Sequence, residues 1–396
     1  MKNFRRFLSL IMICILAVLF STAGCMRESQ TGLAGLPAPV VIEIWHYLQG
    51  AEADALQAQT QRIMGKHPDV LLKLKYVPET NYANTSYQAG AGGKGPEIFI
   101  ASREIISQLY ERGMLAEAAY VDRGAYPAAL AAFQFGGTSF GSPWLTDVSV
   151  LYFRSDLTGV PNDLEDLFFN RGGVSLVEAD MFSLAVWWSA LGGRSLQGGN
   201  PLLMTPENLI FLYNLVNWQM IGSFRVDPDA FAAFAEGRSL YMIAGASQAK
   251  ALTGQGVPWG SIQLSDLVGG QGQPLAGSTL GIANSAIKTT EVLFPAIRLV
   301  TEELSAMESV GAMERAGVLI PANAEYYRLS ESQRHIFPQA HAALNRAWVL
   351  EGNALEWSIF PWHEIAWRKA LEQEMTPEEA LAYGQEEAQR ELTEQR

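Results

Sequence analysis

The chain has 396 residues, of which 48% are hydrophobic and 17% charged. These values are typical of an ordered globular protein with room for two or more domains, and they exclude an intrinsically disordered chain. The formal net charge of −13 argues against nucleic acid or an anionic membrane face as a partner.

The first 24 residues predict a secretory signal peptide, because a basic start precedes an apolar run over residues 7–20. The next segment, Thr22–Ala23–Gly24–Cys25, resembles a lipobox with Thr22 in place of the usual leucine. We predict lipidation of Cys25, followed by a flexible tether over residues 25–39. An uncleaved membrane anchor is the alternative. The other cysteine lies within the leader, so no disulfide is expected in the mature chain.

Residues 40–76 predict a βαβ unit. Residues 40–45 are a buried strand, residues 51–64 an amphipathic helix, and residues 70–76 an alternating strand. Such a unit implies a parallel sheet, in which ligands lie beyond the carboxyl ends of the strands. The residues that follow the first strand are therefore candidates for a site: His46, Tyr47, Leu48 and Gln49.

Three segments approach catalytic or metal-binding motifs, and each departs from its motif. Residues 90–96 have the glycine spacing of a phosphate loop, but a proline stands in the position of the lysine. Ser139 lies in a G-x-S-x-G sequence, yet Pro143 and an extended segment follow where the motif needs a helix. Residues 363–367 carry Trp367 where a zinc motif has its second histidine. We predict no catalytic residue, no cofactor and no metal.

The segment from Gly136 to Leu157 predicts the central strand of the molecule. Its glycines form a turn, Pro143 starts an extended stretch, and residues 148–153 are β-branched or aromatic. A buried Asp147 would be costly without a partner, so we expect this carboxylate at an edge or in a cleft.

The rest of the chain alternates between predicted helices and strands. One helix is expected from an N-cap at Ser102 to Gly113, and another from an N-cap at Thr205 to residue 220. Further helices are expected at residues 162–169, 180–191, 231–235 and 290–304 and from a capping box at residues 376–379, and a strand at residues 240–244.

Taken in order, these segments resemble the bacterial extracellular solute-binding proteins, in particular the sugar- and maltodextrin-binding branch that serves ABC importers. The resemblance runs from about Val40 to Leu392. It is carried by VIEIWHYLQGAEADAL, GKGPEIFIAS, the Gly–x–Pro–Trp segment that leads to Asp147, EGRSLYMIAG, GSTLGIA, GVLIP and TPEEALAYGQEEAQREL.

The resemblance implies an α/β fold of the two-lobe periplasmic-binding-protein type (class II), each lobe a mostly parallel sheet flanked by helices. Lobe 1 would hold residues 40–146 and 280–330, and lobe 2 residues 147–279 and 331–396. The implied protein is an exported monomer, lipid-anchored at the outer face of the cell membrane or on the periplasmic side of the envelope. It would bind a sugar or oligosaccharide by hinge closure and deliver it to ABC permease subunits.

A sugar site needs aromatic planes for stacking and side chains that accept paired hydrogen bonds from hydroxyls. The predicted ligand contacts are Tyr47, Gln49, Glu104, Trp144, Asp147, Trp187, Trp188, Ser278, Thr279 and Trp362. Trp187 and Trp188 could equally be core residues, and Glu104 could simply favour a helix N-terminus. Where the family often has an aromatic residue, this chain has Ala246 and Ser247.

Other functions remain open. The same fold could bind a polyamine, phosphate or another small polar solute, or the protein could be a sensing adaptor that signals without import. A secreted glycoside hydrolase could use Asp147 and Glu104 as paired carboxylates, or Ser139 as nucleophile, but the sequence offers no triad partner in the expected order and no metal spacing.

Overall fold

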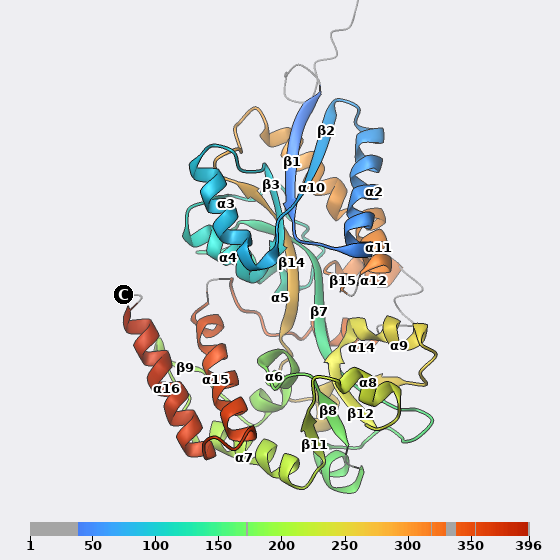
Figure 1. The fold of residues 1–396 in the computed structure, drawn as a ribbon, viewed down its shortest axis with the longest axis vertical. Helices are drawn as coiled ribbons and strands as arrows, with labels where there is room; N and C mark the ends of the chain where they lie inside the picture. The colour runs from blue at the N-terminus through green and yellow to red at the C-terminus, as the bar shows by residue number, and fades with distance from the viewer. Residues whose placement is uncertain (1–38, 172, 318, 330–337, 353, 395–396) are drawn as a thin grey trace, which may run out of the picture.

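The computed structural model describes residues 39–171, 173–317, 319–329, 338–352 and 354–394. The predicted leader, Cys25 and nearly all of the predicted tether lie outside these ranges. Figure 1 shows two lobes, one above the other, with strands β7 (Gly141–Phe153) and β14 (Ala276–Ser285) running between them. Among the described residues, no helix is both long and apolar enough to cross a membrane.

A continuous path of eight strands runs through both lobes in the order β11-β8-β12-β7-β14-β3-β1-β2. The two ends of the path are parallel: β1 pairs with β2 and β3 in one lobe, and β8 pairs with β11 and β12 in the other. The crossing strands β7 and β14 run antiparallel to each other and to their neighbours. Each lobe therefore has a parallel sheet attached to an antiparallel crossing.

The strand bounds are β1 Val40–His46, β2 Val70–Tyr76, β3 Ile98–Ser102, β4 Leu115–Ala116, β5 Gln134–Phe135, β6 Thr138–Ser139, β8 Val174–Leu176, β9 Leu196–Gln197, β10 Asn200–Pro201, β11 Phe224–Val226, β12 Tyr241–Gly245, β13 Gly260–Ile262 and β15 Ile320–Pro321. The short strands β4, β13 and β15 pair with β14 or β7 beside the main path.

Helices cover both lobes (Figure 1). Their bounds are α2 Gly50–Lys66, α3 Tyr82–Ala91, α4 Arg103–Glu111, α5 Pro127–Ala131, α6 Met181–Ala190, α7 Pro206–Met220, α8 Ala230–Ala235, α9 Ala249–Gly254, α10 Phe294–Ser305, α11 Met307–Ala316, α12 Ala324–Leu329, α14 Pro338–Leu344, α15 Leu355–Leu371 and α16 Pro377–Glu394. In Figure 1, α2, α3, α4, α10 and α11 surround the upper lobe, and α6 to α9, α15 and α16 the lower lobe.

Several local predictions are confirmed. β1, α2 and β2 form the predicted βαβ unit, with Val40 opposite Val70 in parallel register. The hydroxyl of Ser102 caps α4, that of Thr205 caps α7, and Thr376 forms the predicted capping box with Glu379. These signals are local in the chain, so they could be identified without knowledge of the tertiary fold.

Two predicted elements differ from the structure. The helix expected over residues 162–169 is instead a π-helical turn at Asp166–Arg171. At its start the backbone N–H of Asn162 donates to the Asp166 carboxylate and that of Asp166 donates to the Asp163 carboxylate, so side chains satisfy N–H groups that have no carbonyl partner at a helix N-terminus. The strand expected over residues 148–153 is only the second half of β7, which is buried along almost its whole length.

A buried asparagine organises the core of lobe 2. Asn208, on the first turn of α7, is fully buried and donates to the carbonyls of Arg194, Leu202 and Leu203. Its side-chain oxygen accepts from the indole N–H of Trp188 at 2.8 Å and from the backbone of Arg194. One amide side chain thus ties α6 and α7 to the loop between them.

Because Asn208→Ala leaves several of these buried groups without partners, we expect it to lower the free energy of unfolding by about 3 kcal/mol. The exposed Asn217, on the same helix, is the matched control, and Asn217→Ala should change stability by less than about 0.5 kcal/mol. Urea unfolding followed by circular dichroism measures both. Equal effects at the two positions would show that the network contributes little.

Candidate ligand-binding site

A cavity of about 290 Å³ lies at the carboxyl ends of the parallel strands of lobe 1. This is the edge at which ligands of parallel sheets bind. Its lining residues come from the segments after β1, β2 and β3, from the start of α2 and α4, from β14 and from the segment before β15. They are Tyr47, Leu48, Glu52, Glu79, Ser102, Glu104, Ser278, Leu280 and Leu319.

Tyr47 lies among the three glutamates of this cavity. Burial raises the pKa of its hydroxyl well above the usual range, and the negative charges of Glu79, Glu104 and Glu52 raise it further, against the opposing effect of a hydrogen bond with Ser102. The ring packs edge-on against Tyr82, at 5.9 Å between centroids. The cavity therefore combines an aromatic side chain held in place with carboxylates that can accept hydrogen bonds.

The crossing strand β14 contributes Ser278 through an irregularity. Its register with β7 shifts between Gly277 and Leu280, and Ser278 has a positive φ of 47°. Bulges of this kind redirect a side chain at the edge of a site. The neighbouring Thr279 is buried instead, with its hydroxyl 3.0 Å from that of Thr146. Of the two predicted contacts here, only Ser278 faces the cavity.

The expectation that Asp147 lies at an edge or in a cleft is wrong. Only 5% of it is exposed, and it is not among the residues that line the cavity. Its carboxylate accepts hydrogen bonds from the backbone N–H of Val148 and from the backbone and hydroxyl of Ser247. A side chain at Gly245 would collide with it, since a Cβ there would lie 2.1 Å from the carboxylate. The partner that burial requires is supplied by the loop after β12.

Three predicted tryptophan contacts are core residues in the structure, with no face open to a ligand. Trp144, Trp187 and Trp188 are each at most 1% exposed. Their indole N–H groups donate to the Leu304 carbonyl, the Leu264 carbonyl and the Asn208 side chain, respectively. Because each indole N–H has a hydrogen-bond partner inside the protein, the whole side chain can be buried in the core.

Two further predicted contacts lie away from the cavity lining. Trp362 is half-buried on α15 and donates to Glu391 of α16. Gln49 is exposed, and its amide donates to the Tyr76 hydroxyl at 2.9 Å.

Of the ten predicted residues, the cavity thus brings together Tyr47, Glu104 and Ser278. The sequence reasoning missed Glu52 and Glu79, although each follows one of the predicted strands, as Tyr47 does.

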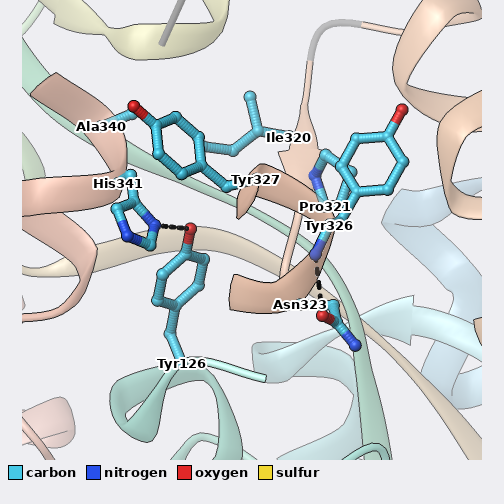
Figure 2. Close-up of a pocket in the computed structure, with 8 residues that line it drawn as sticks. All are labelled: Tyr126, Ile320, Pro321, Asn323, Tyr326, Tyr327, Ala340 and His341. Carbon is cyan, nitrogen blue, oxygen red and sulfur yellow. Dashed lines mark hydrogen bonds between the residues drawn. The ribbon is translucent and has the colours of Figure 1, made fainter. Parts of the chain in front are cut away.

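A second, much smaller cavity of about 10 Å³ lies near the ends of α12 and α14 (Figure 2). There the ring of His341 stacks on Tyr327 with centroids 4.0 Å apart, and its Nδ1 lies 2.8 Å from the Tyr126 hydroxyl. A space of this size admits about one water molecule. The aromatic groups around this space pack against each other, so the space belongs to the packing near these two helices and is not a ligand site.

The other motifs have structural explanations. Ser139 lies on β6, which pairs with β5 in a short hairpin, so the strand–turn–helix context of a nucleophile elbow is missing. Among the described residues, no group of three or more His, Cys, Asp or Glu side chains could hold a metal ion.

Two parallel-sheet lobes joined by crossing strands, with a cavity at the strand ends of one lobe, define a two-lobe solute-binding protein. The family model of bacterial extracellular solute-binding proteins matches residues 58–338, and the chain belongs to this family. The predicted resemblance and fold class are confirmed. A comparison with curated protein sequences finds no match.

Solved structures with the same fold include maltose- and maltodextrin-binding proteins. The maltose/maltodextrin-binding domain MalE from Bdellovibrio bacteriovorus, bound to maltotriose, has a TM-score of 0.69 at 16% identity, covering 89% of this chain and 100% of that one. The GacH receptor of Streptomyces glaucescens has a TM-score of 0.72 at 16% identity, covering 88% and 97%. MalE from Listeria monocytogenes, in complex with maltose, has a TM-score of 0.73 at 15% identity, covering 90% and 98%.

Asp147 makes stability depend on pH. Burial raises the pKa of its carboxyl group from 3.8 to about 6. Between these values the folded state binds more protons than the unfolded state, so this stabilising contribution is full below pH 3.8 and lost as the pH rises through about 6. Asp147→Asn cannot ionise. Between pH 4 and 7.5 its stability relative to wild type should therefore rise by about 2.5 kcal/mol.

Urea unfolding at a series of pH values measures this difference. Asp156→Asn is the control with the opposite sign, because the exposed Asp156 pairs with Arg154, which lowers the pKa of its carboxyl group. A stability difference for Asp147→Asn that does not change with pH would contradict the prediction.

Proposed function

We propose that this protein is the substrate-binding lipoprotein of an ABC importer and that it captures a sugar or oligosaccharide in the cavity around Tyr47. The observation that carries the proposal is the position of this cavity, at the carboxyl ends of β1, β2 and β3 in a two-lobe solute-binding fold. Membership of the solute-binding family and the sugar-binding function of the structural neighbours support it.

The chemistry of the cavity suits a polyhydroxylated ligand. Tyr47 offers an aromatic ring with a polar end, and the carboxylates of Glu52, Glu79 and Glu104 can each accept paired hydrogen bonds from neighbouring hydroxyls. The volume is close to the lower end of the range for small-molecule pockets, about 300–1,000 Å³. It matches a site that receives one or a few sugar units.

The residues that line the cavity support capture of the ligand by lobe closure. All of the described lining residues belong to lobe 1 or to the segments that join the lobes. Lobe 2 would cover the ligand on closing, and a ligand favours the closed state only by its differential affinity for it. We place residues 40–146 and 280–330 in lobe 1, and residues 147–279 and 331–396 in lobe 2.

An amine-bearing solute such as a polyamine is the second candidate. The observation in its favour is that the cavity lining contains three glutamates and no Lys, Arg or His among the described residues. Carboxylates that lose water on closure are stabilised by a cation as well as by hydroxyl groups.

Thermal unfolding of the mature chain with Cys25→Ser, against a panel of sugars, polyamines and anions, tests both candidates. A ligand at about a hundred times its dissociation constant should stabilise the protein by roughly 2.7 kcal/mol. We expect a shift with one class of oligosaccharide and its loss in Tyr47→Ala. Tyr87→Ala, at an exposed tyrosine of α3, is the control. A shift with polyamines alone would replace the ligand class, and no shift with any class would contradict solute capture.

The proposed anchor is tested separately. Cys25→Ser removes the predicted lipid attachment site, so the protein should move from the membrane fraction to the soluble fraction of the producing cell. Immunoblots of the two fractions and mass spectrometry of the N-terminal peptide measure this. If wild type and variant partition alike, the anchor is not at Cys25.

A further inference from the structure

Arg103 lies directly before the cavity residue Glu104, at the start of α4, and makes contacts in two directions. Its Nε and Nη2 lie 3.1 Å and 3.0 Å from Oε1 of Glu104. Its Nη1 donates to the Gly352 carbonyl at 3.2 Å, and its guanidinium lies 3.8 Å from the centre of the Trp357 ring. One side chain therefore touches both a cavity carboxylate and the segment at the start of α15.

This second contact joins the two lobes. Trp357 belongs to α15, which packs on α16, α7 and α6, and its ring packs against the core of lobe 2. Arg103 belongs to α4, which packs beside β14 and α3 in lobe 1. In Figure 1, α4 and α15 lie on the same side of the crossing strands.

The pairing of Arg103 with Glu104 and the contact of Arg103 with lobe 2 depend on each other electrostatically. Arg103 is only 8% exposed, and burial lowers the pKa of its guanidinium while the charge of Glu104 raises it. A buried cation without its anion is costly, so the contact of Arg103 with lobe 2 is more favourable while Glu104 is charged and paired with it. A ligand that takes hydrogen bonds or charge from Glu104 changes that balance.

We propose that Arg103 is a positioning residue that couples what binds at Glu104 to the relative position of the two lobes. The inference rests on the proposed function of the cavity as the ligand site. It needs no contact between the ligand and lobe 2, because Arg103 transmits the change. Coupling of this kind is reciprocal: a change at Glu104 shifts the lobes, and a change in the lobe contact alters affinity at Glu104.

An ion pair elsewhere between the lobes means that loss of the Arg103 contact shifts the lobes without releasing them completely. Lys250 of α9, in lobe 2, pairs with Glu314 of α11, in lobe 1, at 2.6 Å. Loss of the Arg103 contact should therefore change the distribution of lobe positions while the fold stays intact.

The coupling can be measured without any ligand. Spin labels at the exposed Tyr87 of lobe 1 and Met220 of lobe 2, introduced as cysteines in the mature chain with Cys25→Ser, report the inter-lobe distance by pulsed electron paramagnetic resonance. We expect Arg103→Met, Trp357→Leu and Glu104→Gln each to change the ratio of lobe positions by about fivefold to tenfold. Glu104→Gln is decisive, since Glu104 reaches lobe 2 only through Arg103.

Matched controls separate coupling from general damage. Glu111→Gln removes an exposed carboxylate at the other end of α4, outside the cavity lining, and Arg112→Met removes an arginine that lies over Tyr87 within lobe 1. Both should leave the distances at their wild-type values, with the labels moved from Tyr87 to the exposed Lys73 for Arg112→Met. In the Arg103→Met background, Glu104→Gln should have no further effect. If Glu104→Gln behaves like Glu111→Gln, or adds fully to Arg103→Met, the proposal is overturned.

Maltotriose serves as the probe in a second arm. If it binds, it should shift the inter-lobe distance in wild type and shift it less in Arg103→Met; an equal shift in the two would overturn the coupling. If maltotriose does not bind, the choice of ligand class under the proposed function is at fault, and the ligand-free measurements still decide the role of Arg103.

Discussion

The structure depends on the antiparallel pairing of β7 and β14. On the strand path of the described residues, this pair links the two parallel sheets, because β14 pairs with β3 and β7 pairs with β12. Because each lobe is attached to one member of the pair, their register sets how the lobes meet. The register shift of β14 near Gly277 also places Ser278 in the cavity lining. Fold and site thus share one constraint.

The buried crossing carries several polar side chains, and those of Thr146, Asp147 and Thr279 pair within the protein. Thr146 and Thr279 lie side by side, and Asp147 is enclosed by donors of Val148 and Ser247. Such hydrogen bonds fix the geometry of the crossing, but they stabilise the folded state less than an apolar core of the same volume would. Under the proposed lobe closure, a hinge of this composition would keep its register while the lobes change position.

The sequence was sufficient for features that are local or that follow from strand order. The βαβ unit, the Ser102 and Thr205 caps, and the position of Tyr47 and Glu104 at strand ends all follow from patterns within a few residues. The tryptophans could not be placed in this way. Whether Trp188 faces a ligand or the core is decided by Asn208, twenty residues away in the chain, and by helices that approach only in the folded protein. The same holds for Asp147, whose partner Ser247 is distant in sequence.

The negative charge of the cavity limits the classes of ligand that it can bind. In the proposed closure, lobe 2 would cover Glu52, Glu79 and Glu104, and these carboxylates would exchange water for ligand atoms. Each would be destabilised unless the ligand donates hydrogen bonds or carries positive charge. Hydroxyl-rich and amine-bearing ligands meet this requirement, and anions do not. Glu104 differs from Glu52 and Glu79, because Arg103 pairs with its carboxylate and also contacts Trp357 of lobe 2. Under the proposed coupling, selection of the ligand and movement of the lobes both depend on this carboxylate, so a ligand that pairs with Glu104 would also change the position of the lobes.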